Sequence, residues 1–216
     1  MDQLDQALSE IAAIRGQMAR TAEFRGYGPA ALGATAVLAA VGALVQPEWV
    51  PHPLLTPGWY ALLWAGLGAL AAGLIAAEAV ARARRLHGGL ADEMIRAAVE
   101  QFLPAAIAGL LVTLVLVQEA PASTGLLPGL WQVIFSLGVF ATARILPHGI
   151  AAVGVWYLAT GLACLAVAEA APLPWMMGAP FVVGQTLAAV ILWRASRAVP
   201  GAALGLEEIE ELPDEE

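Results

Sequence analysis

The chain has 216 residues, of which 60% are hydrophobic and only 13% are charged. Soluble domains carry about 25% charged residues, and a chain of this length cannot bury so much apolar surface in its own core, which excludes an ordinary soluble protein. The formal net charge of −8 comes almost entirely from residues 207–216, which hold seven carboxylates and no base. The nearly neutral remainder leaves no basic face for nucleic acid.

The N-terminal segment 3–24 is predicted to form an amphipathic helix. Its apolar residues recur at spacings of three and four, which places them on one stripe; they are Leu4, Leu8, Ile11, Ile14 and Met18. Glycines and a proline at 26–29 end this helix. We interpret residues 1–28 as an amphipathic helix and junction. The helix lies in the membrane interface or folds onto the cytoplasmic loops. The alternative is that it docks onto a partner protein or a second copy.

Six apolar segments follow this junction. A helix crosses a bilayer with about 20 apolar residues, and the segments are close to that length; they lie near 29–46, 57–80, 102–118, 126–146, 149–169 and 173–194. We therefore predict an all-α polytopic membrane protein, with six transmembrane helices in residues 29–194 and an acidic cytoplasmic tail in residues 195–216. The fourth and fifth segments form a helical hairpin around a short polar turn.

The arginines predict the orientation of this domain. The chain has no lysine, and its ten arginines fall in the N-terminal arm, the second and fourth loops and the C-terminal tail. The first, third and fifth loops contain none. Because basic residues near helix ends stay in the cytoplasm, both termini are expected there, with the protein in the bacterial inner membrane. Trp49, Trp59 and Trp175 fall at the predicted outer boundary, a depth that tryptophan prefers.

The polar residues near the predicted midplane are uncharged. They are Thr113, Ser136, Thr160 and Gln185. The candidates for ligand contacts or for interhelical hydrogen bonds are Gln185, Ser136 and Thr160 from this group, together with Gln132. Gln185 is the leading candidate for a ligand-binding group, because an amide in hydrocarbon must find hydrogen-bond partners. The more common role of such a group is helix–helix packing. Gly178 and Pro180 are expected to bend the last helix, which either lines a cavity or relieves packing.

Charged residues lie at the predicted helix ends. Glu78 and Arg82 are four residues apart at the inner end of the second helix, so an ion pair at the interface is predicted. Glu119 and Glu169 are expected at outer helix ends, and two carboxylates supply too few oxygen ligands for a typical cation site. They are interpreted as solvated ends.

Signatures of catalysis or metal binding are missing from the sequence. No pair of histidines has the spacing of a zinc site, and Cys164, the single cysteine, excludes an internal disulfide. There is no metalloprotease motif, no nucleophile elbow and no phosphate-binding loop. We therefore expect no catalytic residue, no cofactor and no bound metal.

Three stretches together resemble a family of small, uncharacterised bacterial integral membrane proteins. They are the junction FRGYGP at 24–29, the hairpin LPGLWQVIFSLGVFATARILPHGI at 127–150 and the last helix from Trp175 to Trp193. The resemblance implies a six-helix membrane fold that follows an N-terminal amphipathic helix. It implies no catalytic residues.

The sequence favours a non-enzymatic membrane protein that acts through cytoplasmic partners, as a regulatory or complex-forming module. The N-terminal helix and the acidic tail would be its contact segments, and a homo-oligomer is a further expectation left open. The alternative is a transporter or a protein that binds a small molecule or lipid between the fourth, fifth and sixth helices. A transporter coupled to protons or sodium uses carboxylates or histidines near mid-depth, and the predicted midplane has none.

Overall fold

The structure is a computed structural model that describes residues 28–86, 91–143, 146–147, 149–167 and 172–197. These residues form six α-helices and one short 3-10 helix, and no strand occurs among them. The elements are α2 (Pro29–Trp49), α3 (Pro57–Leu86), α4 (Ala91–Glu119), η2 (Pro121–Leu126), α5 (Leu127–Thr142), α6 (Ile150–Ala166) and α7 (Pro174–Arg197). The prediction of an all-α chain is confirmed. The predicted amphipathic helix at 3–24 and the acidic stretch at 207–216 lie outside the described residues.

Five of the six α-helices belong to segments long and apolar enough to cross a membrane. In hydrocarbon, every backbone N–H and C=O group must be bonded within the protein, which a helix achieves with its own residues. The five segments are Pro29–Trp49, Pro57–Arg82, Val99–Glu119, Pro121–Thr142 and Pro174–Arg197. The remaining helix, α6, is apolar but has only 17 residues, which corresponds to about 25 Å at about 1.5 Å per residue.

Two helices, α3 and α4, extend beyond the apolar segments predicted for them, 57–80 and 102–118. The predicted segment 102–118 is only the second part of α4, which begins at Ala91 and continues through Pro104. Its first part carries an exposed ion pair, with Arg96 Nε 2.7 Å from Glu100 Oε1. Hydropathy marks the part of a helix that lipid surrounds, whereas the backbone hydrogen bonds of these helices continue past that part.

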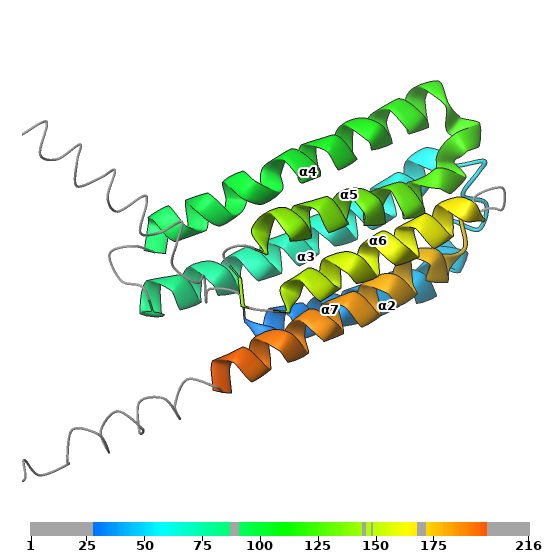
Figure 1. The fold of residues 1–216 in the computed structure, drawn as a ribbon. Helices are drawn as coiled ribbons and strands as arrows, with labels where there is room; N and C mark the ends of the chain where they lie inside the picture. Colours follow the sequence, from blue (N-terminus) through cyan, green and yellow to red (C-terminus); the bar gives the residue numbers. More distant parts are fainter. Residues whose placement is uncertain (1–27, 87–90, 144–145, 148, 168–171, 198–216) are drawn as a thin grey trace, which may run out of the picture.

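The six helices pack side by side in a closed ring (Figure 1). Each helix contacts the next in the chain, and α7 returns to pack along α2, which is the most extensive contact in the bundle. The start of α2 and the end of α7 therefore lie at the same end of the bundle (Figure 1).

Small residues allow the tightest of these contacts. A Cβ atom on Gly178 of α7 would lie 2.5 Å from the Cβ of Ala43 on α2. Between α5 and α6, a Cβ on Gly129 would lie 2.8 Å from the carbonyl oxygen of Gly161. Such close backbone approach is typical of membrane helices, which associate through packing because lipid supplies no hydrophobic driving force.

Aromatic rings fill the centre of the bundle. Tyr157 on α6 is fully buried, and the ring of Phe135 on α5 lies edge-on to it, with 4.8 Å between centroids. Phe181 on α7 contacts both rings. Tyr60 on α3, also fully buried, stacks on Trp131 of α5 with 6.1 Å between centroids. Rings from four helices thus meet in the interior, in the edge-on and stacked arrangements that aromatic pairs prefer.

Candidate functional site

Gln132 is the polar centre of the space between α5, α6 and α7. Its side chain is fully buried on α5. Its Nε2 donates to the carbonyl oxygen of Met176 on α7 at 2.9 Å and to that of Pro128, one turn earlier on α5, also at 2.9 Å. The same nitrogen lies 3.6 Å from the Cys164 sulfur on α6. One amide group therefore joins three helices.

The acceptor on α7 is free because of a proline. Pro180 lies inside α7, four residues after Met176. A proline has no N–H group, so the carbonyl four residues earlier loses its helical donor. The Met176 carbonyl accepts from Gln132 instead, and Cys164 Sγ is a second donor at 3.6 Å. The arrangement satisfies a carbonyl that would otherwise be costly in an apolar interior.

A second buried amide joins α2 and α3 to the residues just before α7. The Oε1 atom of Gln46 accepts from Trp64 Nε1 at 2.8 Å, and its Nε2 donates to the carbonyl oxygen of Pro172 at 3.1 Å. Gln46, the last residue of the predicted segment 29–46, was not among the predicted polar candidates. Its position directly before Pro47 in an apolar run was the available signal.

Two further indole N–H groups also make interhelical bonds. Trp131 Nε1 on α5 donates to Thr113 Oγ1 on α4 at 2.7 Å. Trp156 Nε1 on α6 donates to the carbonyl oxygen of Pro180 on α7 at 2.9 Å. Indole nitrogen can only donate, so each buried tryptophan needs an acceptor, and a neighbouring helix supplies it.

The other predicted midplane residues do not join Gln132 in one site. Ser136 is fully buried and donates to Val133 O at 2.6 Å, while Thr160 donates to Trp156 O at 2.9 Å, so each bonds within its own helix. Gln185 is buried on α7. The residue before it, Gly184, packs closely on the ring of Tyr157.

Five buried polar side-chain atoms have no hydrogen-bond partner among the described residues: Gln132 Oε1, Tyr60 Oη, Tyr157 Oη, Arg82 Nε and Gln101 Oε1. The hydroxyl group of Tyr157 is closely surrounded, since a Cβ on Gly184 would lie 2.5 Å from it. Unsatisfied atoms of this kind cost stability. The rings of Tyr60 and Tyr157 pack on aromatic rings of α5.

Glu78 caps the start of α2 from α3. Its Oε2 accepts the backbone N–H of Ala31 at 2.7 Å. The N-cap residue of α2 is Gly28, which has no side chain to cap the helix, and a Cβ there would collide with the Glu78 carboxylate. A carboxylate at a helix N-terminus bonds free N–H groups and matches the helix dipole. The predicted Glu78–Arg82 ion pair is not among the contacts of the described residues.

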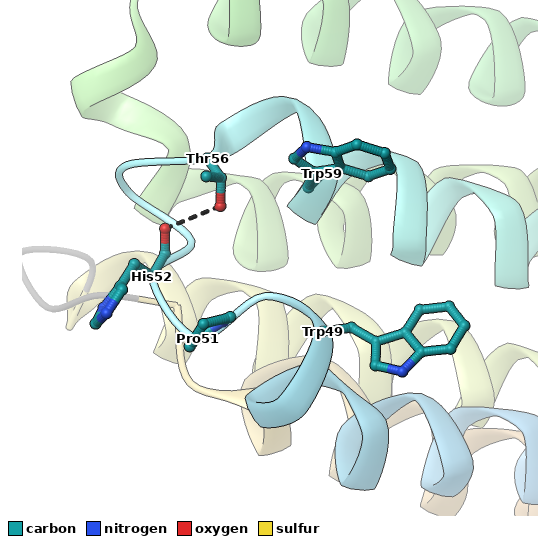
Figure 2. Close-up of a pocket in the computed structure, with 5 residues that line it drawn as sticks. All are labelled: Trp49, Pro51, His52, Thr56 and Trp59. Atoms are coloured by element: carbon teal, nitrogen blue, oxygen red, sulfur yellow. Dashed lines mark hydrogen bonds between the residues drawn. The ribbon is translucent and has the colours of Figure 1, made fainter.

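Two cavities open on the surface between α2 and α3. The first has about 320 Å³ and lies where the end of α2 meets the start of α3 (Figure 2); its lining residues are Trp49, Pro51, His52, Thr56 and Trp59. The second has about 310 Å³; it begins at Trp49 and Val50 and continues along α3. Among the described residues, no cluster of three or more His, Cys, Asp or Glu side chains could hold a metal ion.

No protein-family model matches this chain, and no curated protein or solved structure shows significant similarity to it. The resemblance to small bacterial six-helix membrane proteins stays a prediction. The function is therefore proposed from the contacts described above.

Proposed function

We propose that the protein is a non-enzymatic integral membrane protein of the bacterial inner membrane that acts through cytoplasmic partners. The observation that carries this proposal is that the amide nitrogen of Gln132 is bonded to backbone carbonyl groups. The alternative places a substrate or ligand between α5, α6 and α7, where Gln132 would be a natural binding group. Its amide nitrogen is instead engaged by the carbonyl groups of Met176 and Pro128.

The aromatic rings support the same reading. Phe135, Tyr157 and Phe181 come from α5, α6 and α7 and contact one another in the space where a substrate would have to lie. Protein interiors are close-packed, so opening this space requires rotation of three large rings. A packing role explains these residues without such a rearrangement.

The charged groups also favour a module over a coupled transporter. A transporter needs an ionisable group that both sides of the membrane can reach in turn. Glu78 bonds the first turn of α2 at one end of the bundle, and Glu119 is exposed at the last residue of α4. Neither lies in the middle of the interior, where a coupling ion would have to bind.

The arginines support an orientation with cytoplasmic termini. Those described lie near the bundle end where α2 begins and α7 ends; they are Arg82, Arg84, Arg85, Arg96, Arg194 and Arg197. The guanidinium carbon of Arg197 lies 4.0 Å from the ring centre of Trp193, a pairing suited to the membrane interface. With basic residues facing the cytoplasm, residues 1–28 and the acidic tail are available to proteins on that side.

A comparison of co-purifying proteins tests the proposal. The full chain and a chain that lacks residues 2–22 are purified in mild detergent from the same membranes, and co-purified proteins are quantified by mass spectrometry. We expect a partner that is enriched with the full chain and lost with the deletion, while both chains unfold at similar temperatures.

Reconstituted vesicles provide the opposing test. The full chain in vesicles is expected to show no uptake driven by a proton or sodium gradient. Gradient-driven uptake that the Glu78→Gln variant abolishes would overturn the proposal in favour of a transporter. Glu78→Gln retains an acceptor oxygen for Ala31 N–H, so the variant separates loss of charge from loss of the cap.

A further inference from the structure

The two surface cavities share their mouth, where the end of α2 meets the start of α3, and the second one runs from there along α3; together they are called here the α2–α3 groove. Both cavities are lined by Trp49 and Trp59. The two indole groups come from facing helices and extend in the same direction with a gap between them (Figure 2). From this pair the groove follows α3 to Leu70; the lining residues along it are Val50, Leu62, Leu63, Gly66, Leu67 and Leu70.

Gly66 leaves a depression in the groove, and the buried side chain of Trp64 lies beneath it. A Cβ on Gly66 would meet no atom within 4 Å, so the missing side chain leaves open space. The indole of Trp64 is held by its 2.8 Å bond to Gln46. Trp64 and Leu67 also pack closely on Gly42 of α2. The depression is therefore anchored to a buried hydrogen bond.

The dimensions of the groove match one leaflet of a bilayer. Trp59 and Leu70 are eleven residues apart on α3, which corresponds to about 16 Å at about 1.5 Å per residue. Half of a hydrocarbon core of about 30 Å is about 15 Å. The mouth is flanked by two tryptophans, residues that prefer the level of the lipid head groups. The groove thus begins at head-group depth and ends near the bilayer centre.

We propose that the α2–α3 groove binds one acyl chain of a membrane phospholipid. The chain lies along Leu63, Gly66 and Leu67, and the start of the chain lies between Trp49 and Trp59. This proposal does not depend on the proposed function. The residues that line the lower part are all apolar, and none of the residues that line the mouth is an acid, a lysine or an arginine. The groove therefore recognises the hydrocarbon chain.

The lining of the groove favours a hydrocarbon chain. Beyond Trp49 and Val50, the residues that line the lower part all come from α3, and none has a polar side chain apart from the indole of Trp59 at the mouth. An extended acyl chain needs no hydrogen-bond partner along such a surface.

Photolabelling in a defined bilayer tests this proposal. The full chain is placed in phosphatidylcholine nanodiscs that contain a trace of phosphatidylcholine with a diazirine on one acyl chain. After irradiation, labelled positions are mapped by mass spectrometry. Labelling along 62–70 of α3 is expected to exceed, by several-fold, labelling of the exposed leucines on α4; the comparison positions are Leu110, Leu111 and Leu114. Equal labelling of α3 and α4 would overturn the proposal.

A graded series at Gly66 supplies the matched variants. Gly66→Ala, Gly66→Val and Gly66→Leu fill the groove stepwise, and labelling of 62–70 should fall stepwise to the level of α4. Gly73→Leu is the control, since Gly73 lies on the same helix, also faces open space and does not line the groove. Labelling that is unchanged by Gly66→Leu, or reduced equally by Gly73→Leu, would contradict the proposal.

A second copy of the chain is the competing occupant. Gly66→Cys is combined with Cys164→Ser, which removes the natural thiol, and the protein is oxidised in the same nanodiscs. The acyl-chain proposal predicts a monomer. A high yield of disulfide-linked dimer would instead show that the groove faces another copy, and would overturn the proposal.

Discussion

Gln132 on α5 donates its amide N–H to the carbonyl oxygen of Met176 on α7 at 2.9 Å, and this carbonyl is the one that Pro180 leaves without a helical donor. The proline creates an unsatisfied acceptor in an apolar interior, and an amide from a neighbouring helix satisfies it. The two features depend on each other although they lie on different helices. The position of the Gln132 amide nitrogen is thus explained by the backbone carbonyl groups that it bonds.

Replacement of Gln132 by leucine should destabilise the fold. The substitution removes the bond to Met176, and interhelical hydrogen bonds in membranes contribute about 0.6 kcal/mol on average and up to about 1.7 kcal/mol. The free energy of unfolding is measured by denaturant titration in mild detergent. Thr186→Val is the control, because Thr186 is exposed and bonds only Val182 of its own helix. An unchanged free energy in Gln132→Leu would contradict the packing role.

Two glycine substitutions should have opposite effects on stability. Gly129→Ala places a methyl group 2.8 Å from the carbonyl oxygen of Gly161, and overpacking of this kind costs about 1–3 kcal/mol. Gly73→Ala enters open space on α3 and should be neutral or stabilising by up to about 1 kcal/mol, since alanine favours the helix. Thermal unfolding in detergent measures both. Equal effects at the two positions would refute the observed α5–α6 contact.

The cap on α2 should survive loss of charge but not loss of the acceptor. Glu78→Gln keeps an oxygen for Ala31 N–H, whereas Glu78→Ala removes it and should cost about 0.5–2 kcal/mol, as loss of an N-cap does. Gly28→Ala should also destabilise, because its Cβ would displace the carboxylate. Unfolding titrations of the three variants test this, and a Gln variant as unstable as the Ala variant would point to charge as the main contribution.

Cysteine labelling should report the orientation. In a Cys164→Ser background, cysteines at His52 or Ser123 are expected to react with an impermeant maleimide in intact cells. Cysteines at Gly88 or Gly201 should react only after the membrane is opened. The expectation rests on the arginine-free loops facing outward. The reverse pattern of labelling would invert the orientation and remove residues 1–28 from the cytoplasm.

The helices were predictable because hydropathy reports lipid contact directly. All six apolar segments correspond to helices, although α3 and α4 extend further, since backbone bonding does not stop where apolar residues do. Gln132 was among the predicted polar candidates, but its partners depend on which face of α5 meets α7. Sequence spacing alone does not give that rotation.

The features that the sequence did not predict depend on contacts between residues that lie far apart in the chain. The spacing of Glu78 and Arg82 indicated an ion pair within one helix, whereas Glu78 bonds Ala31, 47 residues away in the chain. The glycines show the same limit of prediction from sequence. Gly161 faces another helix backbone and Gly66 faces open space, yet their sequence surroundings are alike. The groove on α3 depends on that difference, which appears only once the helices are packed.

A double-mutant cycle of Gln132→Leu and Pro180→Ala tests most directly whether the interior polar groups serve packing. Alanine at 180 restores an N–H for the Met176 carbonyl, so the bond from Gln132 becomes less important. The packing role predicts that Gln132→Leu costs less in the Pro180→Ala background than in the natural chain, with a coupling energy of about 0.5–1.5 kcal/mol in detergent unfolding titrations. Effects that add to within about 0.3 kcal/mol, together with loss of a co-purified small molecule in Gln132→Leu, would contradict it and favour a ligand site between α5, α6 and α7.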